Sequence, residues 1–187
     1  MASLSLIPAT MDKLSIVFYP DPVLRKKCRP VESFDGRLQD LAARMLEIMK
    51  ASKGVGLAAP QVGVPIRLFV YNVTGEPADD RVCVNPVLSD PQGASEMDEG
   101  CLSIPGVDVP MRRAAGITLQ GLDLHGRPFE TRAAELLARV LQHENDHLNG
   151  RLIIDNMSEA VRLENRRALK QLEDDYKARQ RPRRKRG

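Results

Sequence analysis

Apolar residues recur at helical spacing in two long stretches of the chain. Between residues 36 and 52 they fall every three or four positions, at Leu38, Leu41, Ala42, Met45, Leu46 and Met49. This spacing predicts an amphipathic helix, with Ser33 or Asp35 as its N-cap and an end before Gly54. Residues 133–147 combine good helix formers with recurring apolar positions, and they predict a second, buried helix.

The remaining apolar runs are short and lie between turn residues, which is typical of β-strands. We expect strand-like runs at residues 14–18, 67–72, 81–88, 116–122, 128–132 and 151–154. Turns are expected at residues 74–80 and 89–94, and the strands on either side of His125 and Gly126 are expected to form a hairpin. A long charged helix is expected from about residue 158 to residue 180. Short strands with three interspersed helices predict an α+β fold rather than a doubly wound sheet.

The buried helix carries the first candidate chemistry. His143 and His147 are four residues apart, so both imidazoles lie on one face and can meet one metal ion. Glu144 lies near enough to reach a water on that metal without being a ligand itself. This H-E-x-x-H pattern predicts two ligands and a general base. The alternative is a helix that carries two histidines and surface carboxylates without any metal.

A catalytic tetrahedral metal site needs a third protein ligand and an open position. Cys101 stands beside Gly100 in a turn-like context, where a thiolate could approach a metal closely. Cys28 and Cys83 are expected to be inert small residues in a loop edge and a strand. A buried apolar role is the alternative for any single cysteine, Cys101 included.

Residues 54–63 read GVGLAAPQVG and form a candidate substrate loop. The stretch has no Gly-Lys-Ser/Thr after its glycines and no preceding strand, so it does not predict a phosphate site. Its small residues would let backbone and substrate approach each other, and Gln61 could offer an amide N–H to a developing oxyanion. The alternative is a tight connection without function.

Taken together, GVGLAAPQVG (54–63), EGCLSIP (99–105) and QHENDHL (142–148) resemble the three signature motifs of the bacterial-type peptide deformylases, in that family's order. The resemblance runs from about Met11 to Gln180. It implies an α+β fold of mostly antiparallel short strands packed around a central metal-binding helix, with an amphipathic N-terminal helix and a long charged C-terminal helix. It also implies a cytoplasmic hydrolase of protein biosynthesis, which removes the formyl group from formyl-methionyl nascent chains during N-terminal processing and releases formate.

The resemblance implies a role for each site residue. It makes Cys101, His143 and His147 the metal ligands, Glu144 the general base and later acid, and Gln61 with the Leu102 backbone N–H the oxyanion donors. Gly56 would contact substrate backbone, and the methionine pocket would be lined by Val55, Met97, Leu136 and Val140. The family implies Fe²⁺ as the native metal, with Zn²⁺, Ni²⁺ or Co²⁺ able to occupy the site, whereas the ligand set by itself suggests zinc.

One position departs from the family. Many relatives carry an arginine a few residues after the cysteine motif, where it helps to fix the substrate backbone, and Asp108 stands there in this chain. Arg112 or Arg113 could replace that arginine, or substrate beyond methionine could be held differently.

Length and charge add the outer parts of the protein. The 187 residues fit one catalytic domain, expected at 11–180, with an N-terminal extension at 1–10 or a native start at Met11, and a flexible basic tail at 181–187. Residues 177–187 hold seven of the 28 basic side chains, which leaves 28 − 7 = 21 against 25 acidic ones in the body. The C-terminal helix and tail are therefore candidates for contact with a ribosome or its RNA, against the alternative of a solvated end. Three cysteines cannot complete a disulfide framework, and no apolar run is long enough for a membrane span.

Two other classes of protein remain open. A metallopeptidase with the H-E-x-x-H pattern would take a His or Glu downstream of His147 as its third ligand. Glu159 and Glu164 lie in the expected last helix, whereas His125 lies upstream. A structural metal protein or RNA-binding adaptor would need a closed four-ligand site, but the remaining cysteines lack any paired spacing.

Overall fold

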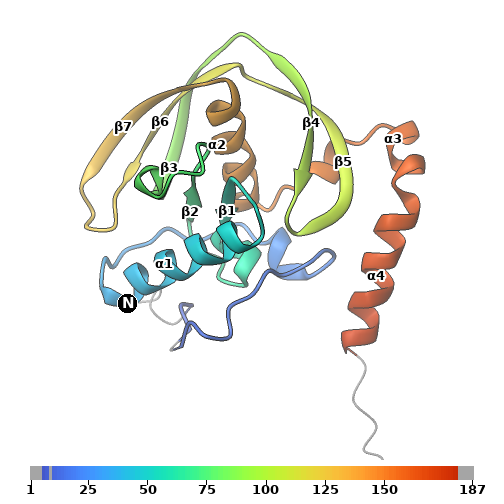
Figure 1. Cartoon of the computed structure of the whole chain (residues 1–187), viewed down its shortest axis with the longest axis horizontal. Coiled ribbons are helices and arrows are strands. Elements are labelled where there is room, and N and C mark those ends of the chain that lie inside the picture. The colour runs from blue at the N-terminus through green and yellow to red at the C-terminus, as the bar shows by residue number, and fades with distance from the viewer. Residues whose placement is uncertain (1–5, 9, 181–187) are drawn as a thin grey trace, which may run out of the picture.

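The computed structural model describes residues 6–8 and 10–180, and the predicted basic tail at 181–187 lies outside them. Its main sheet has five antiparallel strands in the order β1-β2-β3-β6-β7 (Figure 1). These are β1 (Gly56–Ala58), β2 (Leu68–Tyr71), β3 (Arg81–Gln92), β6 (Gly116–Leu122) and β7 (Pro128–Ala134). A separate antiparallel hairpin consists of β4 (Ser95–Cys101) and β5 (Ile104–Arg113).

Helices cover both faces of the inner strands. Successive residues of a strand point to opposite sides, so one strand can contact a helix on each face. Leu68 and Val70 of β2 belong to the apolar cluster that also contains the buried face of α1 (Gly36–Ala51). Phe69 of β2 belongs to a second cluster with residues of α2 (Glu135–Leu148). The strands between these helices are therefore buried on both sides, and α2 is held against the sheet along its length.

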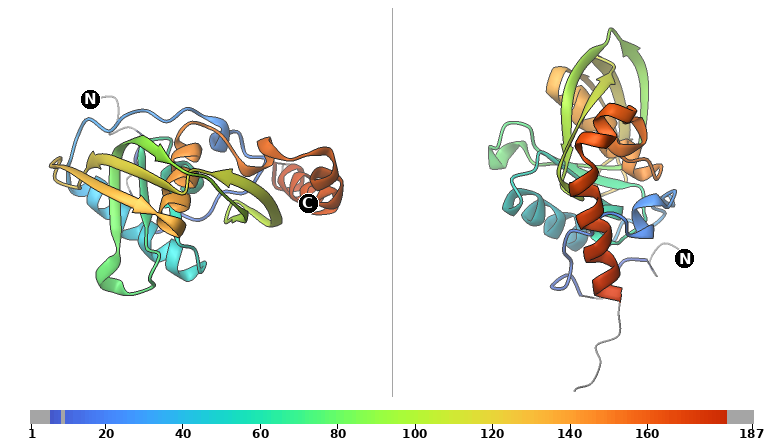
Figure 2. Two further views of the ribbon diagram at one scale, coloured as in Figure 1. Left: turned by 90° about the horizontal axis from the view of Figure 1, so that it is seen from above. Right: turned by 90° about the vertical axis from the view of Figure 1, so that its right-hand side faces the viewer.

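The β4–β5 hairpin and the C-terminal segment form a third apolar cluster. Short 3-10 helix η4 (Ile153–Asn156), α3 (Glu159–Glu164) and α4 (Arg166–Gln180) follow α2 in the chain. Leu169 and Leu172 are the buried residues of α4, and they pack with residues of β5 and η4. The helix therefore stands on the outer side of β5, as Figure 2 also shows.

The periodic segments agree with the sequence-based prediction. Helix α1 matches the expected span, and Asp35 rather than Ser33 is its N-cap, accepting hydrogen bonds from the Arg37 and Leu38 N–H groups at 3.1 and 3.2 Å. The predicted hairpin is β6 and β7. The α+β class is confirmed, with α2 between the main sheet and the β4–β5 hairpin.

Three predictions of strands and turns are wrong. Residues 14–18 form no strand, since the Val17 and Tyr19 N–H groups bond singly to the carbonyls of Gln61 and Ser103. Residues 151–154 lead into the 3-10 helix η4, where Asp155 accepts a hydrogen bond from the Leu152 N–H. The turn expected at 89–94 is largely strand, because β3 continues to pair with β6 as far as Gln92.

Two element boundaries also differ, and two strands were not predicted. The expected helix at 158–180 is two helices, and the Asn165 side chain at the break bonds back to the Val161 carbonyl at 3.0 Å. Ala133 and Ala134 belong to β7 rather than to the buried helix. Strands β4 and β5 were not predicted. The residues of β4 (SEMDEGC) show no apolar alternation, whereas Val107, Val109 and Met111 of β5 alternate with exposed residues, a signal that sequence reasoning missed. The expected extension contacts the core, since Ile7 is buried in the α1 cluster.

Candidate active site

Helix α2 places two imidazoles on one face. The Nε2 atoms of His143 and His147 lie 3.2 Å apart, and the ring centroids are separated by 4.9 Å. His147 is 1% exposed. The four-residue spacing therefore does what the sequence predicts, directing both rings at one point beside the helix.

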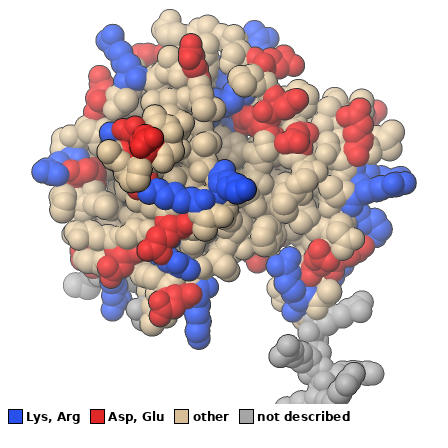
Figure 3. Space-filling model, in the orientation of Figure 1, with Lys and Arg blue, Asp and Glu red and all other residues tan. Residues whose placement is uncertain are grey.

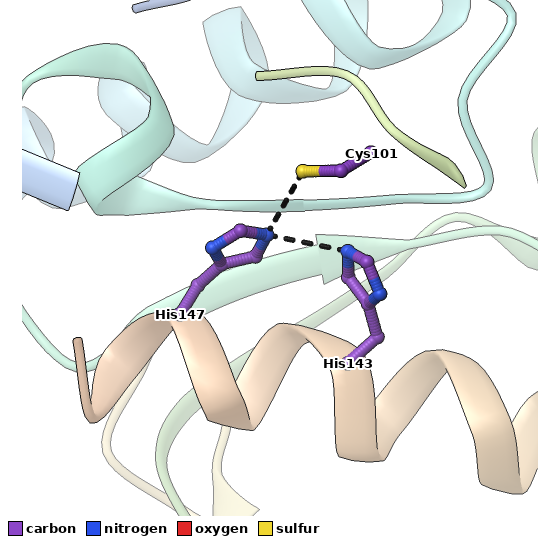
Figure 4. Close-up of side chains that lie close together, drawn as sticks. All are labelled: Cys101, His143 and His147. Atoms are coloured by element: carbon purple, nitrogen blue, oxygen red, sulfur yellow. Dashed lines mark hydrogen bonds between the residues drawn. The ribbon is translucent and has the colours of Figure 1, made fainter. Parts of the chain in front are cut away.

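Cys101 at the end of β4 brings its sulfur to the same point, 3.4 Å from His147 Nε2 (Figure 4). Within the described residues, the ligand atoms of Cys101, His143 and His147 all lie within 4.8 Å of one another. Tetrahedral coordination at ordinary metal–nitrogen and metal–sulfur distances puts neighbouring ligand atoms roughly 3.3–3.6 Å apart. The separation of 3.4 Å falls within this range and that of 3.2 Å lies just below it, so the three side chains fit a single metal ion. His125, Glu159 and Glu164 are not part of this group.

The other two cysteines are poor metal ligands. Cys28 and Cys83 are both buried, and burial raises the pKa of each thiol to about 12. A thiol must be deprotonated to bind a metal. The prediction that these two cysteines are small packing residues therefore fits their surroundings.

Glu99 orients His143, a contact that sequence reasoning missed. Its Oε2 atom lies 3.0 Å from His143 Nδ1, which leaves Nε2 of that ring to face His147. Arg113 binds the Glu99 carboxylate with two hydrogen bonds of 3.0 and 2.9 Å, and Arg139 adds one of 2.7 Å. Burial alone would raise the pKa of Glu99, but the hydrogen bonds from His143 and Arg113 outweigh it and hold that pKa at about 2.

A sequence signal for this network existed in α2. Arg139 lies among apolar residues of a buried helix and is only 5% exposed, and a buried charge needs a partner. The sequence does not reveal which acid provides it. Arg113 also binds Asp146 of α2 at 2.5 Å, so its guanidinium joins the Glu99 carboxylate to the helix that carries the histidines.

Glu144 is a buried acid with a free oxygen atom. It is 3% exposed, and its Oε2 has no hydrogen-bond partner in the described part of the chain. Burial raises the pKa of this carboxyl to about 7. Gly56 on β1 makes room for it, because a Cβ at that position would lie 2.3 Å from Glu144 Oε1. A carboxyl group with such a pKa can take up and return a proton near neutral pH.

Gln61 is fixed by its own helix turn, η2 (Ala59–Val62). Its Oε1 accepts a hydrogen bond of 2.8 Å from the Ala58 N–H, which turns Nε2 toward the metal ligands. Nε2 lies 3.6 Å from Cys101 Sγ and 3.3 Å from Ser103 Oγ. The amide N–H of Gln61, which the sequence offers as a donor, therefore points toward Cys101 and Ser103.

A cavity of about 490 Å³ opens onto these groups. Of the expected substrate-binding residues, Val55, Gly56, Leu136 and Val140 line it, together with Leu102. Val55 and Leu136 are 41% and 46% exposed, so they lie toward its mouth. Met97 does not line the cavity and is 55% exposed on β4, because it lies two residues further from the ligands than Glu99.

Arg112 and Arg113 were the candidates to replace the arginine that many relatives carry where this chain has Asp108. Neither of them lines the cavity that contains Glu144. Arg113 is 9% exposed by side chain and occupied by Glu99 and Asp146. Arg112 lines a different, polar cavity that Asp155 and Asn156 also border. Asp108 itself lines the cavity that contains Glu144.

Comparison with known proteins decides the family. The model of the polypeptide deformylase family matches residues 13–163. The chain belongs to the peptide deformylase family. It is 45% identical over 145 residues to the peptide deformylase of Nitrosococcus oceani, which covers 78% of this chain and 87% of that protein. With the peptide deformylase of Clostridium botulinum it shares 49% identity over 137 residues, or 73% of this chain and 91% of that protein.

Solved structures agree with this assignment. A crystal structure of a peptide deformylase from Legionella pneumophila has a TM-score of 0.82 at 42% identity, covering 90% of this chain and 99% of that one. A peptide deformylase from Plasmodium falciparum has a TM-score of 0.86 at 35% identity, covering 90% and 100%.

The deformylase assignment confirms the predicted activity. The protein is a hydrolase that removes the N-terminal formyl group from formyl-methionyl nascent polypeptides and releases formate. The family is one of metalloenzymes, in agreement with the ligand group on α2 and β4. No helix among the described residues has the length and apolar character to cross a membrane.

Proposed function

We propose that Cys101, His143 and His147 hold one divalent metal ion, and that Glu144, Gln61 and Leu102 carry out deformylation beside it. The observation that carries this proposal is the spacing of the ligand atoms, with His147 Nε2 lying 3.2 Å from His143 Nε2 and 3.4 Å from Cys101 Sγ. Fe²⁺ is the proposed native ion, and Zn²⁺, Ni²⁺ or Co²⁺ are the alternatives for a purified sample. All are bound by mixed imidazole and thiolate ligands.

The residues of the chain then have separate tasks. A divalent cation in this position supplies Lewis acidity, which polarises a carbonyl group and lowers the pKa of a water molecule. Glu144 takes the proton of the attacking water, since its pKa of about 7 suits a base at neutral pH. The same carboxyl then gives the proton to the leaving amine, which becomes the new N-terminus while formate departs.

Negative charge develops on the formyl oxygen during the attack. Gln61 Nε2 and the backbone N–H of Leu102 are the proposed donors to it, and the bond from Ala58 to Gln61 Oε1 keeps the amide in place beforehand. Removal of one such donor typically costs on the order of 10²–10³-fold in rate.

The methionine side chain is proposed to enter the apolar part of the cavity. Val55, Leu136 and Val140 line that part, and Gly56 offers backbone to the substrate. Met97 lies outside the lining and keeps no part in this proposal.

The proposed setting is the cytoplasm, with a single catalytic domain at residues 11–180. Three free cysteines support a reducing compartment. Contact with the ribosome or its RNA through α4 and the basic tail is proposed from the charge of this end of the chain, which includes Lys177 and Arg179 in the last turn of α4.

Formate release tests the proposed roles. Protein loaded with Fe²⁺ under anaerobic conditions should release formate from formyl-Met-Ala-Ser. Glu144→Ala should lower kcat by about 10³-fold, within the range for loss of a general base, while it keeps its metal. Glu164→Ala, which changes an exposed acid of α3, should match the wild type. Absence of formate from the loaded wild type would overturn the proposal.

A further inference from the structure

Two acidic side chains on the rim of the active-site cavity have no part in the proposed chemistry. Asp98 of β4 and Asp108 of β5 both line the cavity, and both are exposed. In the register of the hairpin, Asp98 lies opposite Pro110 and Glu99 lies opposite Val109. Asp98 and Asp108 therefore share one face of the hairpin as diagonal neighbours, while Glu99 points to the other face.

Neither carboxylate is neutralised by a residue in the described ranges, 6–8 and 10–180. No side-chain hydrogen bond or ion pair joins Asp98 or Asp108 to another residue in the described part of the chain. A Cβ on Gly100 would lie 3.1 Å from Asp108 Oδ1, so this carboxylate extends across Gly100, next to the ligand Cys101. In the space-filling view, acidic side chains gather over the region that β4 and β5 occupy in Figure 1 (Figure 3).

The basic groups of the same cavity do not cancel these charges. Arg139 is buried and bound to Glu99, Met111 and Ser95. Lys53 also lines the cavity and is exposed, but it comes from the segment after α1 and forms no ion pair with either aspartate. Two free acids therefore face one free base at the mouth.

An observation that is independent of Asp98 and Asp108 indicates that the cavity binds a ligand. Glu144 Oε2 is buried without a partner in the described residues and belongs to the cavity lining. Asp98 precedes Cys101 by three residues, which is about 10 Å along a strand. An extended peptide with its formyl group at the ligands covers the same distance in about three residues. The side chains after methionine therefore come within reach of the acidic rim.

We propose that Asp98 and Asp108 make this enzyme select formylated peptides that carry Lys or Arg in the two positions after methionine. The selection is electrostatic, because a cationic side chain meets two unpaired carboxylates at the cavity mouth, whereas an acidic one is repelled. The inference rests on the proposed function, since it takes the formyl group to be bound at Cys101, His143 and His147.

The test compares three amidated peptides, formyl-Met-Lys-Lys, formyl-Met-Ala-Ala and formyl-Met-Glu-Glu, with metal-loaded protein. The kcat/KM of the wild type should be about tenfold higher for the lysine peptide than for the glutamate peptide, as two exposed charge pairs allow. High salt should reduce this ratio, because it screens exposed charges. The double variant Asp98→Asn/Asp108→Asn should bring the ratio near one and raise kcat/KM for the glutamate peptide. A misfolded variant could not produce that gain.

Asp40→Asn is the matched control, since Asp40 is an exposed acid of α1 that does not line the cavity. It should keep the wild-type ratio. Two results would overturn this inference: equal kcat/KM of the wild type for both charged peptides, or an unchanged ratio in the double variant. In either case, formate release from the alanine peptide would still support the proposed function. Failure to release formate from all three peptides would overturn both.

Discussion

Two glutamates of the site are both buried, and the presence or absence of partners among the described residues gives them opposite properties. Glu99 is buried among His143, Arg113 and Arg139, and its pKa falls to about 2. Glu144 is buried with one oxygen atom unpartnered among the described residues, and its pKa rises to about 7. The first therefore remains an anion that orients a ligand, and the second is able to move a proton.

Gly56 lets us test how closely Glu144 must be placed. Gly56→Ala should lower kcat by about 10²-fold, because a Cβ at 2.3 Å from Glu144 Oε1 displaces the carboxylate, and a shift of about 1 Å can cost that much. The measurement is formate release under metal-loaded conditions, with metal content determined on the same sample.

Gly36→Ala in α1 is the control for this change, since a Cβ there meets nothing within 4 Å. It should leave kcat unchanged. Equal kcat values for Gly56→Ala and the wild type would contradict the placement of Glu144.

At the scale of elements, the site depends on how α2 is joined to the β4–β5 hairpin. Arg139 of α2 donates to Glu99 and to the Ser95 carbonyl of β4, and to the Met111 carbonyl of β5. Arg139 thus connects the helix that carries the histidines with the strand that carries Cys101, as Arg113 also does through Glu99 and Asp146.

Arg139→Met should lower the free energy of unfolding by about 3 kcal/mol, because it removes one partner of a buried ion pair and the side-chain hydrogen bonds to two backbone carbonyls. Denaturant unfolding measures this loss. Arg132→Met, an exposed position on β7, should change stability by less than about 0.5 kcal/mol. A similar loss in both variants would show that Arg139 does not join the elements.

The elements differ in how far the sequence predicts them. Helix α1 and the β6–β7 hairpin are visible in the apolar pattern, because each buries one regular face. Strand β4 is not, because Asp98 and Glu96 are exposed and Glu99 is buried in ion pairs. The polar sequence of β4 therefore gave no strand signal, although pairing with β5 stabilises the strand.

The same distinction applies to the site. The motifs identify its residues, and the structure brings Cys101, Gln61, His143 and His147 together. The partners of Glu99 lie in separate elements of the chain, so their pairing is a property of the fold that spacing does not encode. Met97 was expected in the methionine pocket but does not line the cavity, because the direction of β4 relative to the cavity depends on tertiary packing.

At the scale of the whole molecule, the fold brings three distant segments to one point. Strand β1 and η2 carry residues 56–62, the end of β4 carries Cys101, and α2 carries the two histidines. Helix α2 packs against β1, which places Glu144 against Gly56, while the hairpin approaches from the other side (Figure 1). This convergence creates one proposed metal site with three protein ligands.

The ratio of bound metal to protein, measured after anaerobic loading and removal of free metal, tests whether these three residues bind the ion. The wild type should hold about one ion per chain, as a site with three protein ligands does. Cys101→Ala should hold much less, and Cys28→Ala, which changes a cysteine outside the group, should still hold about one. A Cys101→Ala protein that retains the wild-type ratio would contradict the account.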